Sequence, residues 1–337
     1  MSNVRLRQSN FELLRLLSMF FIVFYHLILF FIVKVDDNVI YKATYLPLHV
    51  AVLCFVMISG YFHIKPSFRG LAKLIFPLVI FYLPLTAIGY FFFDVGSIKD
   101  FFFFSKSPYW FIRTYLYLFL FAPVLNVFLT TTKRRCYLLI TLCFIAVYMG
   151  TMHDGALRDG KNLVMFMLLY VIGDLLHTYQ DKFSKISLLS LVLTYVAINV
   201  CLVVAYIYLS GSLLGKALWL ISYPYCSPLL LINAIMLFLL FSKIRISSPV
   251  VNYLSGSVFV IYIFHHQSLI VNKLLHPVVM DVYNKFSNSP FLVLFSLACI
   301  TLVVMLISII IDKLLSPINV RLVSIVSRLD EKNFFQL

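Results

Sequence analysis

A succession of long apolar runs is the feature that most constrains how this chain can fold. The first run covers residues 11–33, and its only acidic, basic or histidine side chains are Glu12, Arg15 and His26. A helix needs ~20 apolar residues to cross a bilayer, so this run is long enough. Hydrophobic residues make up 62% of the 337 residues and charged residues 12%, whereas soluble domains have roughly 45–50% and about 25%. The sequence therefore predicts a polytopic membrane protein.

About ten segments are apolar over a window of ~20 residues, although the fifth and sixth are short. We expect these spans at residues 11–33, 45–63, 72–93, 109–129, 135–150, 161–177, 186–209, 217–241, 252–273 and 291–314. We found no Gly/Ser-rich linker, charge block or repeat that would mark a second domain. The predicted fold class is an all-α membrane protein, a polytopic bundle of about ten transmembrane helices.

The bundle is expected to form one domain over residues 1–337, with its core at about 9–315. Residues 316–337 are expected to be a cytoplasmic tail, whose basic and apolar side chains favour a helix lying at the membrane surface.

The net charge of +14 comes from Lys and Arg residues in short connectors, which is the usual topology signal of membrane proteins. Connectors on the side of the N-terminus carry more of them, so both termini are expected in the cytoplasm and the protein in the plasma membrane. No single basic face is present, so we expect no nucleic acid partner. The six cysteines are scattered without a CxxC pair, and no zinc-type cluster is expected.

Arg15 and His26 are expected on one face of the first helix. Eleven residues at ~100° each make ~1100°, which is close to three full turns, and they separate the two side chains by ~16 Å along the axis. Glu12 is three residues before Arg15 and can pair with it on that face.

Each of these residues also has a plain structural interpretation. Arg15 could extend to cytoplasmic headgroups, and His26 could be a hydrogen-bonded histidine between helices. Ionisable groups inside spans are costly, however, and usually face a cavity or pathway. A neutral imidazole in such a cavity can accept a proton near pH 7, as a general base must.

A second polar pair lies in the ninth expected span. Tyr262 and His265 are three residues apart and share a helix face, two turns after Ser255. The alternative is a close helix interface made by the small residues at 255–257. Two deep histidines on separate helices favour a shared polar site.

A cluster of cations follows the second expected span. Ser59-Gly60 predicts a break in the helix, and Lys65, Arg69 and Lys73 come next. Ordinary positive-inside charge would explain them. Together with Arg15, they could also bind the phosphates of an anionic ligand.

The fourth expected span opens with Tyr109 and Trp110, followed by Arg113. An aromatic belt at the outer membrane surface is the plain interpretation. Trp110 and Arg113 could instead contact a substrate at the extracellular mouth.

Together these motifs resemble the integral membrane acyltransferase family, often called acyltransferase-3. The family's Arg-x10-His in the first helix is matched within "NFELLRLLSMFFIVFYHL", and its SGY/F turn by "ISGYF". Its basic stretch before proline is matched by "FRGLAKLIFP", its WF motif by "YWFIR", and its late S-x-x-x-Y-x-x-H helix broadly by "SGSVFVIYIFHH". One departure is that many members have Arg-x-x-Arg where this chain has Arg69-x3-Lys73.

The resemblance implies a membrane O-acyltransferase, most commonly an O-acetyltransferase for a surface polysaccharide. It implies acetyl-CoA or another acyl-CoA as donor substrate, no permanently bound cofactor, and a hydroxyl of a cell-surface or lipid-linked glycan as acceptor. Arg15, Lys65, Arg69 and Lys73 would then bind the anionic donor. His26 would be the base or a transient acyl carrier, Glu12 would orient Arg15, and Tyr262 and His265 would line the same cavity.

The alternative from another class is a transporter or flippase for a glycan or lipid. It has the same polytopic architecture, but transporters often contain related halves, and no convincing repeat is present. A glycan polymerase or ligase would usually carry a large charged outer loop, and the longest outer connector, at residues 274–290, is short. The sequence does not identify the acceptor glycan or the oligomeric state. It is compatible with transfer of an acetyl or a succinyl group, and with direct transfer or an acyl-histidine intermediate.

Overall fold

The structure is a computed structural model that describes residues 8–102, 109–131, 137, 140–145, 148 and 158–328. Every regular element within these ranges is a helix, so the predicted all-α class is confirmed. In chain order the helices are α1 (Ser9–Leu27), α2 (Val39–Tyr45), α3 (Val50–Phe62), α4 (Phe68–Pro77), α5 (Leu83–Phe93), α6 (Trp110–Thr131), α8 (Leu163–Thr178), α9 (Gln180–Ser184), α10 (Leu188–Leu209), α11 (Leu213–Ser222), α12 (Pro228–Lys243), α13 (Pro249–Ser255), α14 (Val258–His266), α15 (Ser268–Ile270), α16 (His276–Phe286) and α17 (Pro290–Ser327).

Short turns of other helix types extend several of these elements. Wider π-helical turns occupy Ile28–Ile32, Leu78–Tyr82 and Val271–Leu275, and tighter 3₁₀ turns occupy Pro47–His49, Ile98–Phe101 and Arg158–Gly160. The turn at Ile28–Ile32 continues α1, and the turn at Pro47–His49 joins α2 to α3. π-helical turns inside helices are frequent at functional sites, and one of them begins two residues after His26.

Six helical segments of the described part are long and apolar enough to cross a membrane, or seven if a bent pair counts as one span. The six segments are Ser9–Ile32, Val39–Phe62, Phe68–Phe93, Trp110–Thr130, Leu188–Leu209 and Pro290–Ser327. The shorter apolar helix α8 overlaps the expected span 161–177, and α11 and α12 overlap the expected span 217–241. Much of the expected span 135–150 lies outside the described residues. Ten spans and two cytoplasmic termini therefore stay predictions.

Two expected spans are not continuous helices. The span expected at 217–241 is interrupted between Ser222 and Pro228, where Pro224 and Pro228 cannot supply the backbone N–H groups that a helix interior needs. The span expected at 252–273 is also interrupted, because the chain bends by 61° between His266 and Ser268. Hydropathy reports how apolar a segment is and does not report whether its helix is continuous.

Two smaller expectations were also wrong. The helix does not break at Ser59-Gly60, since α3 continues to Phe62 and ends before His63, which has a left-handed φ of 55°. The segment after residue 315 does not form a separate surface helix among the described residues. It continues α17, which runs for 38 residues to Ser327 and packs along α4.

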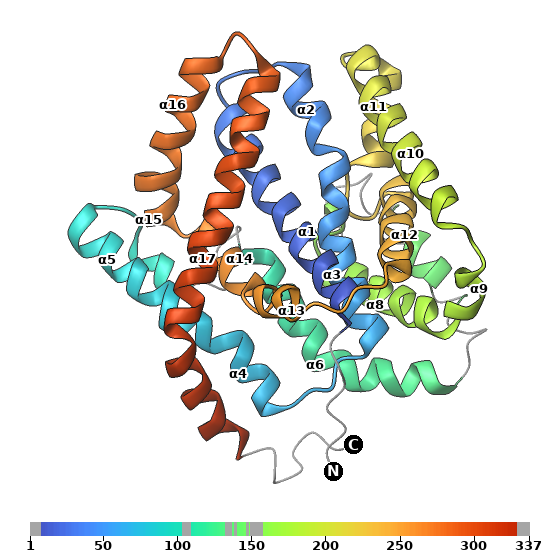
Figure 1. Ribbon diagram of the computed structural model, residues 1–337, viewed down its shortest axis with the longest axis horizontal. Helices are drawn as coiled ribbons and strands as arrows, with labels where there is room; N and C mark the ends of the chain where they lie inside the picture. The colour runs from blue at the N-terminus through green and yellow to red at the C-terminus, as the bar shows by residue number, and fades with distance from the viewer. Residues whose placement is uncertain are drawn as a thin grey trace.

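Helix α3 lies at the centre of the bundle, and α10 lies at its edge (Figure 1). In the most apolar window of each span, 83% of the residues are buried for the span containing α3 and 11% for α10. The α3 helix packs against α1, α8 and α12. The polar side chains of α1 therefore lie next to the most buried helix of the bundle.

Two glycines bring α3 and α8 into close contact. A Cβ atom on Gly60 would lie 2.0 Å from the carbonyl oxygen of Tyr170, and one on Gly173 would lie 2.2 Å from the carbonyl oxygen of Met57. Small residues allow helix backbones to approach closely in membrane proteins. Gly60 of the "ISGYF" motif therefore has a packing role in this fold.

Candidate functional site

A cavity of about 210 Å³ opens between α1, α3, α6 and α14. Its lining is mostly apolar and aromatic, with a few polar groups, which is the usual make-up of a small-molecule site. The polar and aromatic lining residues are Arg15, Tyr25, His26, His49, Phe55, Ser59, Trp110, Phe111, Tyr115, Tyr225, Phe259, Tyr262 and His266.

One face of α1 forms a wall of this cavity. Arg15, Met19, Ile22 and His26 all line it, and they follow one another at the three- and four-residue intervals of a helix face. No glycine or proline interrupts α1, so helical geometry alone fixes this alignment. The sequence prediction that Arg15 and His26 share one face is confirmed.

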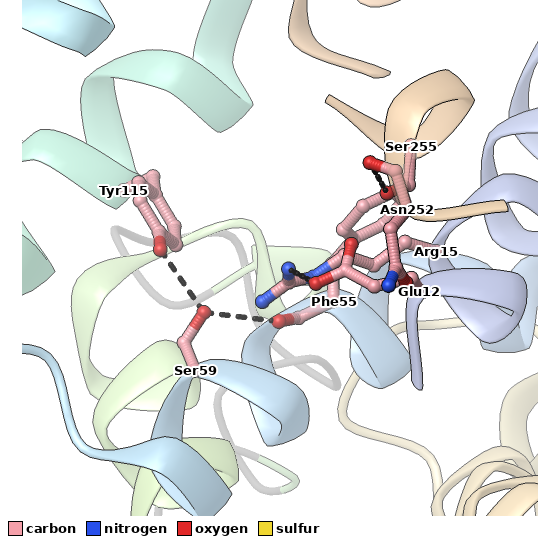
Figure 2. Close-up of polar contacts among 7 residues, drawn as sticks. All are labelled: Glu12, Arg15, Phe55, Ser59, Tyr115, Asn252 and Ser255. Atoms are coloured by element: carbon pink, nitrogen blue, oxygen red, sulfur yellow. Dashed lines mark hydrogen bonds and ion pairs between the residues drawn. The ribbon is translucent and has the colours of Figure 1, made fainter. Parts of the chain in front are cut away.

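Arg15 lies at one end of the cavity, near the hydroxyls of Ser59 and Tyr115. Its Nη1 atom donates a 2.8 Å hydrogen bond to Oε1 of the buried Glu12, as the sequence predicted. Figure 2 shows the guanidinium group reaching from α1 toward Ser59, which is 3.0 Å from the Tyr115 hydroxyl and 3.1 Å from the Phe55 carbonyl oxygen. This group of side chains is called the arginine end below.

Ser255 does not line the cavity. Its hydroxyl donates to the carbonyl oxygen of Asn252 at 3.2 Å (Figure 2), within the short helix α13. The α13 helix packs against α1, so Ser255 belongs to the support of the arginine end.

His26 is hydrogen-bonded to His265 from α14. Nδ1 of His26 lies 3.0 Å from Nε2 of His265, and Nδ1 of His265 lies 2.8 Å from the carbonyl oxygen of Ile261. A carbonyl oxygen can only accept, so Nδ1 of His265 carries the proton and its Nε2 is an acceptor. Nδ1 of His26 must therefore be the donor, and the lone pair of a neutral His26 is at Nε2. The hydrogen-bond chain fixes His26 in the tautomer that a general base needs.

His266 adds a third imidazole to this group. Its ring centroid is 4.5 Å from that of His26, and it lines the cavity. His265 was also expected to line the cavity, but it is not among the lining residues and is 2% exposed. His266 was not among the site residues predicted from the sequence. It is four residues after Tyr262 on the cavity-lining face of α14, and this spacing is the signal that could have indicated it.

The three imidazoles could also be read as a metal site, because their nearest ring nitrogens lie within 4.8 Å of one another. Zinc ligands at ~2.0–2.1 Å from the metal would place tetrahedral nitrogens about 3.4 Å apart. The 3.0 Å separation between His26 and His265 instead matches a hydrogen bond. The arrangement as it stands fits a hydrogen-bonded pair with an adjacent third ring.

Aromatic rings enclose the end of the cavity opposite Arg15. His49 lies among Tyr25, Tyr223 and Tyr225, with ring centroids 4.5, 4.2 and 5.1 Å away. The ring of Trp110 is 5.4 Å from that of Tyr225. Tyr225 lies in the connector between α11 and α12.

This aromatic end of the cavity was not predicted from the sequence. Tyr225 lines it from the connector where the helix is interrupted between α11 and α12. The two prolines at 224 and 228 are the sequence signal that could have indicated this break. His49 is the last residue of the 3₁₀ turn that precedes α3, and it was not predicted as a site residue.

The predicted cations do not form one cluster. Arg69 and Lys73 line a second pocket with Asn319 and Ser324 of α17, whereas Arg15 lines the main cavity. Leu74, next to Lys73, lines the main cavity, so α4 separates the two spaces. Lys65 is exposed and is in the lining of neither pocket.

The two residues predicted at the extracellular mouth also separate. Trp110 lines the cavity, and Arg113, one turn further along α6, is not among the lining residues. Tyr109 is 2% exposed, so it packs inside the bundle and does not form an outer belt. Tyr262 lines the cavity as predicted.

Comparison with known proteins gave one finding. A family model described as an acyltransferase domain, Acyl_transf_3, matches residues 8–312. No curated protein and no solved structure matched the chain. The matched range includes α1 to α16 and all residues that line the main cavity.

Proposed function

The chain belongs to the acyltransferase-3 family and is a multi-pass membrane acyltransferase, and from that premise we propose the reaction it performs. The enzyme lies in the plasma membrane and transfers an acyl group from cytoplasmic acyl-CoA to a hydroxyl of a cell-surface or lipid-linked glycan. The proposed acyl group is acetyl.

The observation that carries this proposal is that His26, which lines the cavity together with Arg15, is hydrogen-bonded to His265. The pair offers an imidazole lone pair at a fixed position, and Arg15 offers a cation about 16 Å away along α1. An extended pantetheine arm has a comparable length. The nucleotide part of the donor can therefore stay near the arginine end while its thioester reaches His26.

The proposed reaction is an acyl transfer with balanced proton movements. The acceptor hydroxyl gives its proton to Nε2 of His26 while its oxygen attacks the thioester carbonyl carbon. The new C–O bond forms, the C–S bond breaks, and His26 returns the proton to the leaving sulfur, which gives free CoA and the glycan ester. A sugar hydroxyl is a weak nucleophile, so removal of its proton in the transition state is where a base contributes most.

His265 stabilises the charged intermediate in this scheme. When His26 takes up a proton, its Nδ1–H still donates to Nε2 of His265, and this bond then has a cationic donor. Such charge-assisted bonds are roughly twice as strong as neutral ones. The buried Glu12 carboxylate offsets the charge of Arg15, so the cavity does not hold two uncompensated cations during the step.

The donor is anionic, which supports a role for Arg15 and for the second pocket. Arg15 presents a planar guanidinium that suits phosphate oxygens. Arg69 and Lys73 lie on the far side of α4 with Asn319 and Ser324. We propose that Arg15 binds the donor inside the main cavity, and that Arg69 and Lys73, with the exposed Lys65, attract its nucleotide at the membrane surface.

The experiment compares O-acyl groups on the host's surface glycan by proton NMR. A deletion strain is complemented with wild type, with His26→Ala, or with His276→Ala, at matched membrane abundance. His276 is a histidine outside the cavity and serves as the control. Wild type and His276→Ala are expected to restore the acyl signals, and His26→Ala is expected not to.

Three results would overturn parts of this proposal. Full acylation in the deletion strain would place the acceptor elsewhere and favour transport of a glycan or lipid. Full activity of His26→Ala would remove the histidine from the mechanism and leave the family assignment intact. If the spectra show the methylene signals of a succinyl ester and no acetyl methyl signal, the transferred group is succinyl and not acetyl.

A further inference from the structure

We propose that the aromatic end of the cavity is a subsite for one pyranose ring of the acceptor. This pyranose subsite consists of Tyr25, His49, Trp110 and Tyr225, which all line the cavity. The inference rests on the proposed function for the identity of the ligand, and it is carried by the hydrogen bonds and rings around His49.

His49 is a buried hydrogen-bond acceptor that lacks a donor. Its Nδ1 lies 2.9 Å from the carbonyl oxygen of Tyr223, and a carbonyl oxygen only accepts, so Nδ1 carries the proton. Nε2 is then an acceptor, and it has no hydrogen-bond partner among the described residues, although His49 is only 5% exposed. A buried polar atom left without a partner is costly, and a ligand that donates a hydrogen bond here would remove that cost.

The rings around His49 suit a sugar. Tyr25 meets His49 nearly edge to face at an interplanar angle of 72°, and Tyr225 is stacked on it at 12°. Trp110 adds the largest ring of the lining, 5.4 Å from Tyr225. A pyranose has an apolar face of C–H groups that packs on aromatic rings, and a rim of hydroxyls that donate hydrogen bonds. Planar apolar ligands would fit the rings but would leave Nε2 of His49 without its donor.

The rim of this subsite is held in place by hydrogen bonds. The Tyr25 hydroxyl lies 2.9 Å from the Tyr223 hydroxyl, and the backbone N–H of Tyr225 donates to the carbonyl oxygen of Asp159 at 3.0 Å. These contacts join α1, the connector before α12 and the turn before α8. Rings fixed in this way keep their orientation when a ligand binds, which reduces the entropic cost of binding.

The subsite adjoins the proposed base. Tyr25 is the residue before His26, their rings are 5.1 Å apart, and the ring of Tyr25 is 4.5 Å from that of His49. A pyranose bound against His49 would therefore present another of its hydroxyls toward His26. The subsite would select the ring and orient it, while the choice of hydroxyl depends on which one faces Nε2 of His26.

Tryptophan fluorescence gives a direct test, because the chain has only two tryptophans. Trp110 lines the subsite, and the ring of Trp219 is stacked 3.7 Å from Tyr223 behind it. The full-length protein in lipid nanodiscs is titrated with methyl pyranosides of gluco, galacto, manno and rhamno configuration, without acyl-CoA. Tetrahydropyran, which has the ring without hydroxyls, is the ligand control. A Trp219→Phe variant leaves Trp110 as the sole reporter.

A matched pair of substitutions separates the two nitrogens of His49. In His49→Asn the amide can still donate to the Tyr223 carbonyl, but it cannot supply an acceptor at the Nε2 position. In His49→Gln the amide oxygen can take the Nε2 position. Loss of one neutral hydrogen bond corresponds to about a tenfold higher Kd. We expect that rise for His49→Asn, a smaller one for His49→Gln, and none for the exposed control Tyr208→Phe.

The outcomes distinguish this inference from the proposed function. Saturable binding of at least one pyranoside, weakened in His49→Asn and absent for tetrahydropyran, supports the subsite even if no acyl transfer is detected. A second outcome is that wild type transfers acyl groups and that a well-folded His49→Asn variant transfers them and binds the sugar equally well. That outcome would overturn the subsite and leave the proposed function unaffected. Absence of a saturable change with every pyranoside would overturn it as well.

Discussion

Nδ1 of His26 donates a hydrogen bond to Nε2 of His265 across 3.0 Å, and Nδ1 of His265 in turn donates to the backbone of its own helix. Acid–base enzymes usually orient a catalytic histidine with a carboxylate. Here a second neutral imidazole takes that place, and its own tautomer is set by the Ile261 carbonyl oxygen. The orientation of His26 therefore depends on the helical backbone of α14.

The first prediction concerns His265 as a positioning residue. In His265→Asn the amide can still bond the Ile261 carbonyl oxygen but does not reach His26. In His265→Gln an amide oxygen can replace the Nε2 acceptor. We expect kcat to fall about 100-fold in His265→Asn, because His26 loses its fixed tautomer, and less than about tenfold in His265→Gln. Steady-state kinetics with acyl-CoA checks this expectation.

The KM values separate this role from a merely structural one. A positioning residue that never contacts substrate should leave the KM for acyl-CoA within about threefold of wild type, because binding contacts are unchanged. Equal activity of the Asn and Gln variants would show that the acceptor atom at Nε2 is unimportant.

The second prediction concerns the ion pair between Glu12 and Arg15. Arg15→Lys keeps the charge but loses the planar fork that can bond Glu12 and a phosphate at once. Loss of a charge-assisted hydrogen bond corresponds to about a tenfold to hundredfold weaker interaction. We expect that rise in the KM for acyl-CoA, measured in nanodiscs, and a smaller rise for Glu12→Gln. A larger effect of Glu12→Gln than of Arg15→Lys would argue that Glu12 itself takes part in the reaction.

The third prediction concerns the crossing of α3 and α8. An added Cβ at Gly60 or Gly173 would lie within 2.2 Å of a backbone oxygen, so the helices must move apart. We expect Gly60→Ala and Gly173→Ala each to destabilise the fold by about 1–3 kcal/mol. Thermal unfolding in detergent, followed by the loss of monodisperse protein, measures this. Leu193→Ala on the exposed face of α10 should behave like wild type, and an unchanged Gly60→Ala would contradict the close crossing.

The fourth prediction concerns the three clustered histidines. Since the short contact between His26 and His265 matches a hydrogen bond, treatment with a strong chelator should leave acyl transfer unchanged. Metal analysis of the purified protein should find less than one equivalent of any transition metal. Loss of activity on chelation, restored by one particular metal, would replace the hydrogen-bonded pair with a metal centre.

The sequence was sufficient for features that depend on local helix geometry. Arg15 and His26 share a face because a regular helix without glycine or proline allows no other arrangement. The pairing of Glu12 with Arg15 follows from the same spacing. The all-helical class followed from the length and apolarity of the runs.

The sequence was insufficient where the site depends on interrupted helices. Tyr225 lines the cavity from the connector in which Pro224 and Pro228 separate α11 from α12. A hydropathy window averages over such breaks and reads each broken pair as one span. The separation of Arg69 from Arg15 by α4 is a matter of helix packing, which spacing along the chain does not encode.

The end of α14 at His266 also has an electrostatic consequence. The carbonyl groups of a last helical turn carry about half a negative elementary charge, and a protonated histidine at a helix C-terminus can gain up to ~2 kcal/mol from it. His265 and His266 both lie in that last turn, and His26 is hydrogen-bonded to the first of them. The bend that ends the helix inside the bundle thereby supplies a fixed partial negative charge for a transient imidazolium, in a place where this chain has no carboxylate bonded to the pair among the described residues.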